Sequence, residues 1–556
     1  MDFKRMMWAM TLSLAILMGW EYFFPTPKPQ AQNAATSTAT TTPTAVASPL
    51  GSTTPIMVET DTVKAVIDEK SGDLRGLTLL KYDATEDKTK NFVLFDNSDK
   101  HTYIAQSDLL DAQGASLLKD VQFSAAQKSY ALNGDKVEVR LTAPAKNGLQ
   151  INKIYTFTKG SYLVNVRFEV QNQGGVTKIA PAYNIVRDNH TPEGQGWFMA
   201  SYTGPVVYTP DVDAFQKVKF GDLDDDFTSG KDTVEYQRKA TGGYVGMIQH
   251  YFAATWLAQT HEAQSNLCEA GCTVSVKKRA DNLYAAGFSL PAKDIAAGGM
   301  QTFSANLYAG PQTTKVLNQV APNLDLLKDY GRVHIFAAPL FWLLNKLHDF
   351  IGNWGWAIVV LTLIVKAVLY PLNDKAYKSM AKMRTVAPKM EALKKQYAND
   401  QMGMQQAMMK LYRDEQINPL GGCLPMLLQM PIFIGLYWMI FLSVELRQAP
   451  WLGWISDLSR SDPFYILPLL MAATMWFQTK LSPPPSDPMQ AQMMKIMPLM
   501  FSIMFFFFPA GLVLYYVVNN LLTIAQQWYI NRKLNLVTSN GVVLDKEPVG
   551  NKKKKK

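Results

Sequence analysis

The stretch WGWAIVVLTLIVKAVLYPLNDKAYKSMAKMR, from Trp354 to Arg384, decides how the chain is interpreted. Its first half is almost wholly apolar, begins with two tryptophans and ends at Pro371, which predicts a membrane span over residues 351–371. One charged residue, Lys366, lies inside this span. A cation at the centre of a membrane helix costs about 2.5–3.5 kcal/mol on insertion scales, so its surroundings must offset that cost.

Two interpretations of Lys366 stay open on spacing alone. Lys366 lies shortly before Pro371, roughly 8 Å away along a helix, so its long side chain can snorkel to the lipid head groups. In the second interpretation, Lys366 faces a water-filled cavity that a polar substrate uses, because charges within spans commonly mark functional sites.

The composition predicts a multi-pass membrane protein with at least one further domain. The chain has 556 residues, of which 48% are hydrophobic and 18% are charged, and its net charge is +9. Acidic and basic residues nearly balance between positions 25 and 350, so the positive excess lies beside the apolar segments. Such an excess is typical of cytoplasmic loops.

Residues 1–24 predict a first span that stays in the mature protein as an anchor, with the amino terminus in the cytoplasm. Lys4 and Arg5 precede the apolar run, and the sequence Glu21 to Pro25 follows it where a cleavable signal would carry small residues. A cleaved signal peptide is the competing interpretation. The following segment, residues 25–55, is rich in Pro, Thr, Ala and Ser and predicts a flexible linker.

Residues 56–322 predict a large all-β domain of the sandwich type. Short alternating runs such as VEVRLT recur between turn residues, and INKIYTFT and SYLVNVRFEV flank Lys159-Gly160 as a hairpin. The chain contains no HExxH, GxSxG or P-loop motif and no Cys/His cluster with zinc spacing. The sequence therefore indicates a protein that is not an enzyme and that needs no metal or cofactor.

Three cysteines occur in the chain. Cys268 and Cys272 flank Glu-Ala-Gly in an expected hairpin, so they form a disulfide in an oxidising compartment or remain two buried thiols. Cys423 lies at the start of an apolar run and is interpreted as a small packing residue.

The second half of the chain predicts five spans joined by short loops. Residues 323–350 have helical periodicity and predict an amphipathic helix on the outer membrane surface, or alternatively a helix packed on the β-domain. Residues 372–419 carry nine basic residues and methionines at spacings of three and four, which predicts a cytoplasmic helical hairpin. The remaining expected segments are a span at 420–442, an outer loop at 443–463, a span at 464–480, a cytoplasmic loop at 481–495, spans at 496–509 and 510–530, and a basic cytoplasmic tail at 531–556.

Several motifs in this half resemble the YidC/Oxa/Alb family of membrane protein insertases. The residues that carry the resemblance are NPLGGCLPMLLQMPIFIGLY from Asn418, SVELRQAP from Ser443, FPAGLVLYYVVNNLLTIAQQ from Phe508 and MAKMR from Met380. The resemblance is dense from about Asn353 to Trp528. The first span, the large β-domain and the stretch GGYVGMIQHYF match the Gram-negative form of the family.

The resemblance implies a polytopic helical membrane protein with six spans. Five of these spans would form a core around a hydrophilic groove that is open to the cytoplasm and to lipid, and the β-domain would be a periplasmic supersandwich. The implied function is to insert, fold and assemble newly made inner-membrane proteins, alone or with the Sec translocon. The implied partners are nascent membrane proteins, the ribosome, the Sec translocon with its accessory subunits, the signal recognition particle with its receptor, and anionic lipids, with a monomer being sufficient.

The resemblance also assigns roles to individual residues. Lys366 supplies the charge of the groove, although the family usually carries arginine there, so this chain keeps the charge without the planar guanidinium. The polar lining of the groove would be Thr362, Gln429, Tyr516 and Asn519. The face along which a substrate slides would be Cys423, Pro425, Met430, Pro431, Phe433, Phe505 and Phe506. Apart from the resemblance, the lysine run at the end of the chain either contacts phosphates of ribosomal RNA or anionic lipid or is only a solvated signal for cytoplasmic topology. This run is Lys552, Lys553, Lys554, Lys555 and Lys556.

Two other classes of protein compete with the insertase interpretation. A transporter or channel would use Lys366 as an anion site, but no inverted repeat is apparent among the spans. An anchored periplasmic enzyme or sugar-binding protein would carry its site in the β-domain, where no catalytic motif occurs.

Overall fold

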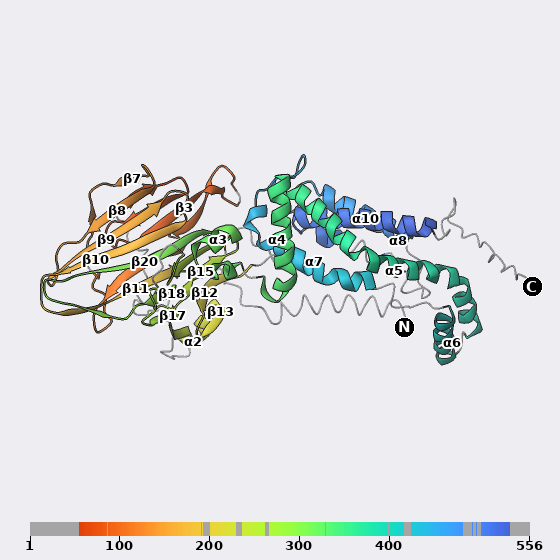
Figure 1. Ribbon diagram of the computed structural model, residues 1–556, viewed down its shortest axis with the longest axis horizontal. Helices are drawn as coiled ribbons and strands as arrows, with labels where there is room; N and C mark the ends of the chain where they lie inside the picture. The colour runs from red at the N-terminus through yellow and green to blue at the C-terminus, as the bar shows by residue number, and fades with distance from the viewer. Residues whose placement is uncertain are drawn as a thin grey trace, which may run out of the picture. The chain divides into compact units, whose positions relative to one another are not determined.

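The computed structural model describes residues 55–533 with internal gaps, and these residues form two compact units that divide at residue 329 (Figure 1). The gaps are residues 86, 100, 120, 191, 193–200, 229–235, 262–265, 329, 398–399, 416–423, 482–491, 493–495 and 497–501. The expected first span and the linker up to residue 54 lie outside the described residues, as does the tail from residue 534.

The first unit is built on two sheets, of which the larger has eleven strands. Its strand order is β14-β17-β18-β11-β5-β4-β3-β2-β1-β7, and β19 pairs with β11 beside this path. The strands are β1 Pro55–Glu59, β2 Val63–Asp68, β3 Leu74–Asp83, β4 Asn91–Asn97, β5 Thr102–Leu110, β7 Ser129–Ala131, β11 Thr177–Arg187, β14 Tyr236–Ala240, β17 Cys272–Lys278, β18 Tyr284–Ser289 and β19 Lys293–Ile295.

The second sheet has nine strands in the order β13-β12-β15-β16-β20-β10-β9-β8-β6. Its strands are β6 Ser124–Ala125, β8 Lys136–Thr142, β9 Leu149–Thr158, β10 Leu163–Asn172, β12 Thr203–Thr209, β13 Asp213–Lys217, β15 Tyr244–Gln249, β16 Phe252–Leu257 and β20 Met300–Pro311. The expected hairpin around Gly160 joins β9 to β10, and Gly160 has the positive φ of 71° that such a tight turn favours.

The two sheets pack through alternate residues of their strands, which confirms the predicted all-β sandwich. β10, for example, buries every second side chain, the pattern of a strand with one face on a core. Hydrogen bonds also join the sheets: Tyr103 on β5 donates to the carbonyl of Met247 on β15 at 3.2 Å, and Lys153 on β9 donates to the carbonyl of Ser107 on β5 at 3.2 Å. Two short helices, α2 Phe220–Thr228 and α3 Thr314–Val320, accompany the sheets.

The second unit is helical. Its elements, together with η1 at the end of the first unit, are η1 Leu324–Leu327, η2 Gly331–Val333, α4 His334–Ile351, α5 Trp354–Gln396, α6 Gln401–Asp414, α7 Leu424–Leu442, η4 Val444–Leu446, α8 Ile466–Leu481 and α10 Ala510–Lys533. Its core is one apolar cluster that includes Leu344 of α4, Leu361 of α5, Met439 of α7, Met471 of α8 and Tyr515 of α10.

The sequence predicted one helix over residues 323–350, but in the structure the helix α4 begins only at His334. Asn323 and Gly331 both have left-handed backbone, with φ of 57° and 56°. An α-helix requires negative φ at each residue, so these two positions interrupt the apolar periodicity that suggested one continuous helix.

The helix α5 continues through the point where the sequence suggested that the span would end. It runs for 43 residues and contains both Pro371 and Pro388. Proline removes one backbone hydrogen bond, but its fixed φ near −65° is itself helical, so a long helix can pass through it. The second half of α5 packs against α6 through Val386 and Met390, which contact Met408 and Leu411.

Within the described residues, one helical segment, Trp354–Ser379, is long and apolar enough to cross a membrane, and Gln429–Leu442 is a shorter apolar helix. The expected fifth span, residues 496–509, is interrupted by the gap at residues 497–501. The count of six spans therefore stays a prediction.

Candidate functional site

Lys366 lies on α5 with its side chain directed to α10. Its ammonium group donates a hydrogen bond to the hydroxyl of Thr523 at 2.7 Å, and Thr523 in turn donates to the carbonyl of Asn519 at 2.7 Å. Lys366 is half-buried. In the structure its side chain therefore hydrogen bonds within the helical unit.

A stripe of polar side chains runs along α10 next to this contact. Asn519, Thr523, Gln527 and Asn531 recur at every fourth position, so they lie on one face of the helix, and all four are buried. Asn373, seven residues after Lys366 on the same face of α5, is buried as well. Of these residues, sequence analysis identified Asn519 and missed the others, although the four-residue spacing of polar residues was visible in the sequence.

The charge of Lys366 has no carboxylate close to it. Among the residues that the structure describes, no Asp or Glu oxygen lies within ion-pair distance of its ammonium group. Further along α10, the side-chain oxygen of Gln527 and the side-chain nitrogen of Gln526 are buried without a hydrogen-bond partner among the described residues. Buried polar groups of this kind are normally satisfied by water or a ligand.

Thr362 and Gln429 were both expected to line a groove. The Thr362 side chain is completely buried, and its hydroxyl donates to the carbonyl of Ile358 in its own helix at 2.7 Å. The Gln429 side chain donates to the hydroxyl of Tyr515 at 2.8 Å, which links α7 to α10. Thr362 therefore stabilises its own helix turn, whereas Gln429 connects two helices.

Tyr516 lies among aromatic rings. Its ring centroid is 5.2 Å from that of Phe433 and 5.1 Å from that of Phe505. Phe505 is only 3% exposed, so its ring belongs to the packed interior. The neighbouring Phe507, with 54% of its surface exposed, faces outward instead.

The other residues of the expected sliding face are distributed differently. Met430 is 44% exposed, while Pro431 and Phe433 are half-buried on α7, and Phe506 packs on Tyr465 with ring centroids 5.2 Å apart. Cys423 and the run from Lys552 to Lys556 lie outside the described residues, and Pro425 belongs to the first turn of α7.

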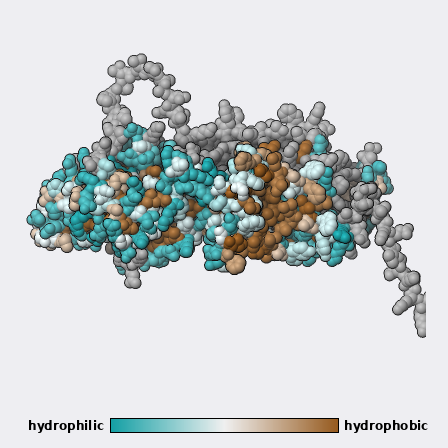
Figure 2. Space-filling model, turned by 90° about the horizontal axis from the view of Figure 1, so that it is seen from above, coloured by the Kyte–Doolittle hydropathy of each residue, from teal (hydrophilic) through white to brown (hydrophobic). Residues whose placement is uncertain are grey.

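The surface of the helical unit is strongly apolar. Phe350 and Trp342 of α4 are 93% and 63% exposed, and Val368 of α5 is 70% exposed. Figure 2 shows hydrophobic residues gathered over the helices, whereas the visible surface of the β-unit is mostly hydrophilic. α4 buries Ala337, Phe341 and Leu344, yet it exposes large apolar residues on its other side, as a helix at a lipid surface does.

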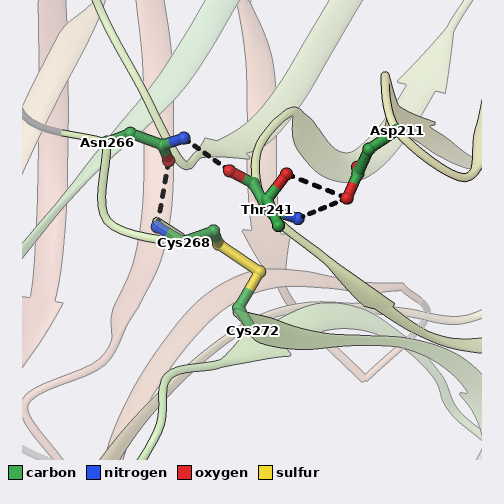
Figure 3. Close-up of a disulfide and its surroundings, with 5 residues drawn as sticks. All are labelled: Asp211, Thr241, Asn266, Cys268 and Cys272. Atoms are coloured by element: carbon green, nitrogen blue, oxygen red, sulfur yellow. Dashed lines mark hydrogen bonds between the residues drawn. A yellow bond between two sulfur atoms is a disulfide. The ribbon is translucent and has the colours of Figure 1, made fainter. Parts of the chain in front are cut away.

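In the β-unit, Cys268 and Cys272 form a disulfide (Figure 3). The loop before it is held by side-chain hydrogen bonds: Asn266 accepts from the backbone N–H of Cys268 at 3.0 Å and donates to the carbonyl of Thr241. Thr241 donates to the carboxylate of Asp211 through its N–H and its hydroxyl, both at 2.9 Å. The expected hairpin around the two cysteines is absent, because β16 before them belongs to the nine-stranded sheet and β17, which begins at Cys272, belongs to the eleven-stranded sheet. The bridge therefore closes a turn at the start of β17, and both cysteines are buried.

The comparison with known families covers nearly all of the described chain. Residues 55–343 match the family described as YidC periplasmic domain, and residues 346–537 match the family described as 60Kd inner membrane protein. The chain is 62% identical over 546 residues to the membrane protein insertase YidC of Neisseria meningitidis serogroup C (strain 053442), which covers 98% of this chain and 100% of that protein.

More distant relatives carry the same name. The membrane protein insertase YidC of Laribacter hongkongensis is 46% identical over 547 residues, covering 96% of this chain and 98% of its own. A crystal structure described as an active YidC insertase with the first transmembrane domain resolved is 20% identical, covers 86% of this chain and 93% of its own, and has a TM-score of 0.39.

These matches define a membrane protein insertase, a class of proteins that are not enzymes. The chain belongs to the YidC family, in the form with a periplasmic domain that Gram-negative bacteria carry.

Proposed function

We propose that this protein inserts newly made proteins into the inner membrane, using the charge of Lys366 and the polar stripe of α10 as its working site. The observation that carries the proposal is the hydrogen bond from Lys366 to the neutral hydroxyl of Thr523, with no carboxylate nearby among the described residues. A cation placed within an apolar helix and left without an acid is available to a substrate.

The proposed mechanism begins with an acidic or polar tail of the substrate. Its carboxylate replaces Thr523 as the partner of Lys366, and a hydrogen bond between two charged groups is stronger than one to a neutral hydroxyl. Water around Gln526 and Gln527 keeps the tail hydrated in a groove that opens to the cytoplasm and to lipid. The contact is transient because the same water competes for both charges.

The energy for insertion comes from the substrate and from the membrane, and no nucleotide is required. Each strongly apolar residue contributes about −0.3 to −0.6 kcal/mol when a segment enters lipid, which sums to several kcal/mol for a full span. The membrane potential contributes about 2.3 kcal/mol per 100 mV for each acidic charge that moves outward. Exposed apolar residues such as Met430 and Phe507 offer the departing segment a surface to slide along.

The proposal extends to topology and partners. Both termini lie in the cytoplasm and the β-unit lies in the periplasm, and a monomer suffices. The Sec translocon, the ribosome and the signal recognition particle with its receptor deliver substrates, and the protein also assists their folding and assembly. These roles are expectations from the family resemblance.

The tail from Lys552 to Lys556 contacts ribosomal RNA or anionic lipid in this proposal, because lysine runs bind phosphates. Truncation after Gly550 should lower ribosome co-sedimentation most at low salt. Equal co-sedimentation of the truncated and full chains at every salt concentration would contradict this contact.

The central test replaces Lys366 and compares substrates that differ only in the charge of their tails. Lys366→Ala should lower insertion of a single-span substrate with an acidic tail about tenfold, the loss of one charge-assisted hydrogen bond. Lys366→Arg should be tolerated, and Lys366→Glu should be worse than alanine because it repels the tail. Protease protection of the newly made substrate, in cells depleted of the wild-type protein, measures the effect.

A matched control lies on the same helix. Lys378 is exposed and paired with Asp374, so Lys378→Ala should leave insertion unchanged. If Lys366→Ala inserts acidic and neutral tails as well as the wild type does, the proposed role of Lys366 is wrong.

A further inference from the structure

A polar cavity of about 820 Å³ opens on one face of the larger sheet of the β-unit. Its floor is formed by four neighbouring strands, because Gln106 on β5, Asn184 on β11, Gly287 on β18 and Ser275 on β17 are direct cross-strand partners in one row. Cross-strand partners in an antiparallel sheet point to the same face. The row therefore presents two amides and a hydroxyl to the same space.

Gly287, in the middle of this row, places no side chain in the cavity. A Cβ atom at Gly287 would lie 2.1 Å from the carbonyl oxygen of Tyr183 and 2.2 Å from the side-chain oxygen of Asn184. Only glycine fits this position, and its missing side chain leaves room for the Asn184 amide above β18. The next row of cross-strand partners consists of Asp108, Ala182 and Ser289, and their side chains are also small or polar.

The acidic residues of the cavity wall already have partners within the wall. Asp68 forms an ion pair with Arg75 at 2.9 Å, and Asp73 accepts from Gln106 at 3.0 Å. Asp108 accepts from the hydroxyl of Ser116 at 2.9 Å, and burial raises the pKa of its carboxyl. These carboxylates therefore oppose an acidic ligand less than free carboxylates would.

Three lysines of the lining lack such partners. Lys70, Lys119 and Lys277 are exposed, and no carboxylate of the described residues lies within ion-pair distance of their ammonium groups. The lining thus combines hydrogen-bonding groups on the floor with cations that carry uncompensated charge. Phe288, which is 3% exposed, is the one aromatic residue among the described lining residues, so the cavity offers no ring on which a sugar could stack.

We propose that this cavity binds an acidic peptide segment in extended conformation, with its carboxylates on Lys70, Lys119 and Lys277 and its backbone on the row from Gln106 to Ser275. Gln106 already donates to Asp73 and accepts from Arg279, both at 3.0 Å, so it offers a peptide its second N–H and its second lone pair. The Asn184 amide can likewise donate to and accept from a peptide backbone. This inference rests on the proposed function only for the source of the peptide, which would be the translocated part of an insertion substrate.

Binding can be measured on the full chain in detergent by fluorescence anisotropy with a labelled Asp/Glu-rich peptide. We expect the acidic peptide to bind with an affinity that falls as salt rises, and its Asn/Gln counterpart to bind about tenfold more weakly. The triple variant Lys70→Gln, Lys119→Gln, Lys277→Gln should lose about tenfold in affinity for the acidic peptide. Ser275→Trp should block the floor without changing any charge.

The matched control replaces three exposed lysines of the same unit that do not line the cavity, Lys136, Lys239 and Lys293, and should bind like the wild type. Far-UV circular dichroism verifies that each variant is folded. Equal affinity of the cavity and control variants, equal binding of the neutral peptide, or binding of oligogalacturonate but not of the peptide would each overturn the proposal. The proposed function is tested separately, by measuring how well the same variants insert a substrate that has no acidic outer segment.

Discussion

Lys153 of the β-unit and Lys366 of the helical unit are both withdrawn from bulk water, but their charges have different surroundings. In the β-unit, the Lys153 side chain is fully buried, donates to the Ser107 carbonyl and lies 3.7 Å from a carboxylate oxygen of Asp73. In the helical unit, Lys366 is half-buried and its described hydrogen-bond partner is the hydroxyl of Thr523. One cation has its countercharge within the fold, whereas the other has none among the described residues.

This difference in countercharge suggests a structural role for Lys153 and agrees with the role in insertion that we propose for Lys366. Burial lowers the pKa of Lys153, and Asp73 and Asp108 oppose this by favouring the charged form. A buried charge is tolerated when acids of the same fold compensate it. Lys366 has no such acid among the described residues, and in the proposed function a substrate carboxylate supplies the missing countercharge. The comparison therefore predicts that Lys153 matters for stability and Lys366 for insertion.

The largest expected effect is on the stability of the β-unit. Lys153→Met leaves Asp73 and Asp108 near the core without their cation, which should lower the free energy of unfolding by about 3–5 kcal/mol. Denaturant unfolding of the full chain in detergent, followed by far-UV circular dichroism, measures the loss. Lys136→Met, an exposed lysine on the neighbouring strand β8, is the matched control and should change stability by less than about 0.5 kcal/mol.

The same assay applied to Lys366→Met sharpens the contrast. This variant removes a cation without stranding an acid, so it should unfold no more easily than the wild type. If Lys366→Met destabilised the protein as much as Lys153→Met, the two lysines would have the same structural role and the comparison would fail.

A smaller effect is expected at the disulfide of the β-unit. Cys268 and Cys272 are four positions apart, and closing so short a loop should stabilise the fold by about 2 kcal/mol in the chain-entropy description. The double variant Cys268→Ser, Cys272→Ser should lose that amount, while insertion should remain. Mass spectrometry of alkylated, unreduced protein tests the bridge itself, and full labelling of both thiols would show that it is absent.

The smallest expected effect comes from a variant that gives Lys366 a carboxylate partner, as Lys153 already has. Thr523→Asp places a carboxylate where the hydroxyl now accepts from Lys366. An internal ion pair should compete with the acidic tail of a substrate and lower its insertion severalfold, while neutral tails insert normally. Thr523→Asn, which is similar in size and uncharged, is the control. Undiminished insertion of acidic tails by Thr523→Asp would show that the free charge of Lys366 is not what the substrate uses.

Local patterns in the sequence predicted the class of each unit and some of its individual elements. The apolar run after Trp354 is long enough to predict a membrane span, and a span is helical because lipid offers its backbone no hydrogen-bond partners. The alternation in the β-unit produces strands that bury every second side chain. The turn at Gly160 follows from a residue that accepts positive φ. These features depend on neighbours within a few positions, so they can be inferred without the fold. The presence of a charge within a span was visible for the same reason.

The partners of that charge were decided by tertiary structure. Lys366 and Thr523 are 157 positions apart, and which polar residue of α10 meets α5 depends on how the two helices pack. The same holds for the cavity floor, where the register of four strands brings Gln106, Asn184 and Ser275 into one row. The continuation of α5 through Pro371 was also decided by the fold. Proline removes one hydrogen bond from a helix, and the packing of the rest of α5 can offset that loss. Sequence alone determined which residues are apolar, charged or turn-forming, and three-dimensional packing determined which of them meet.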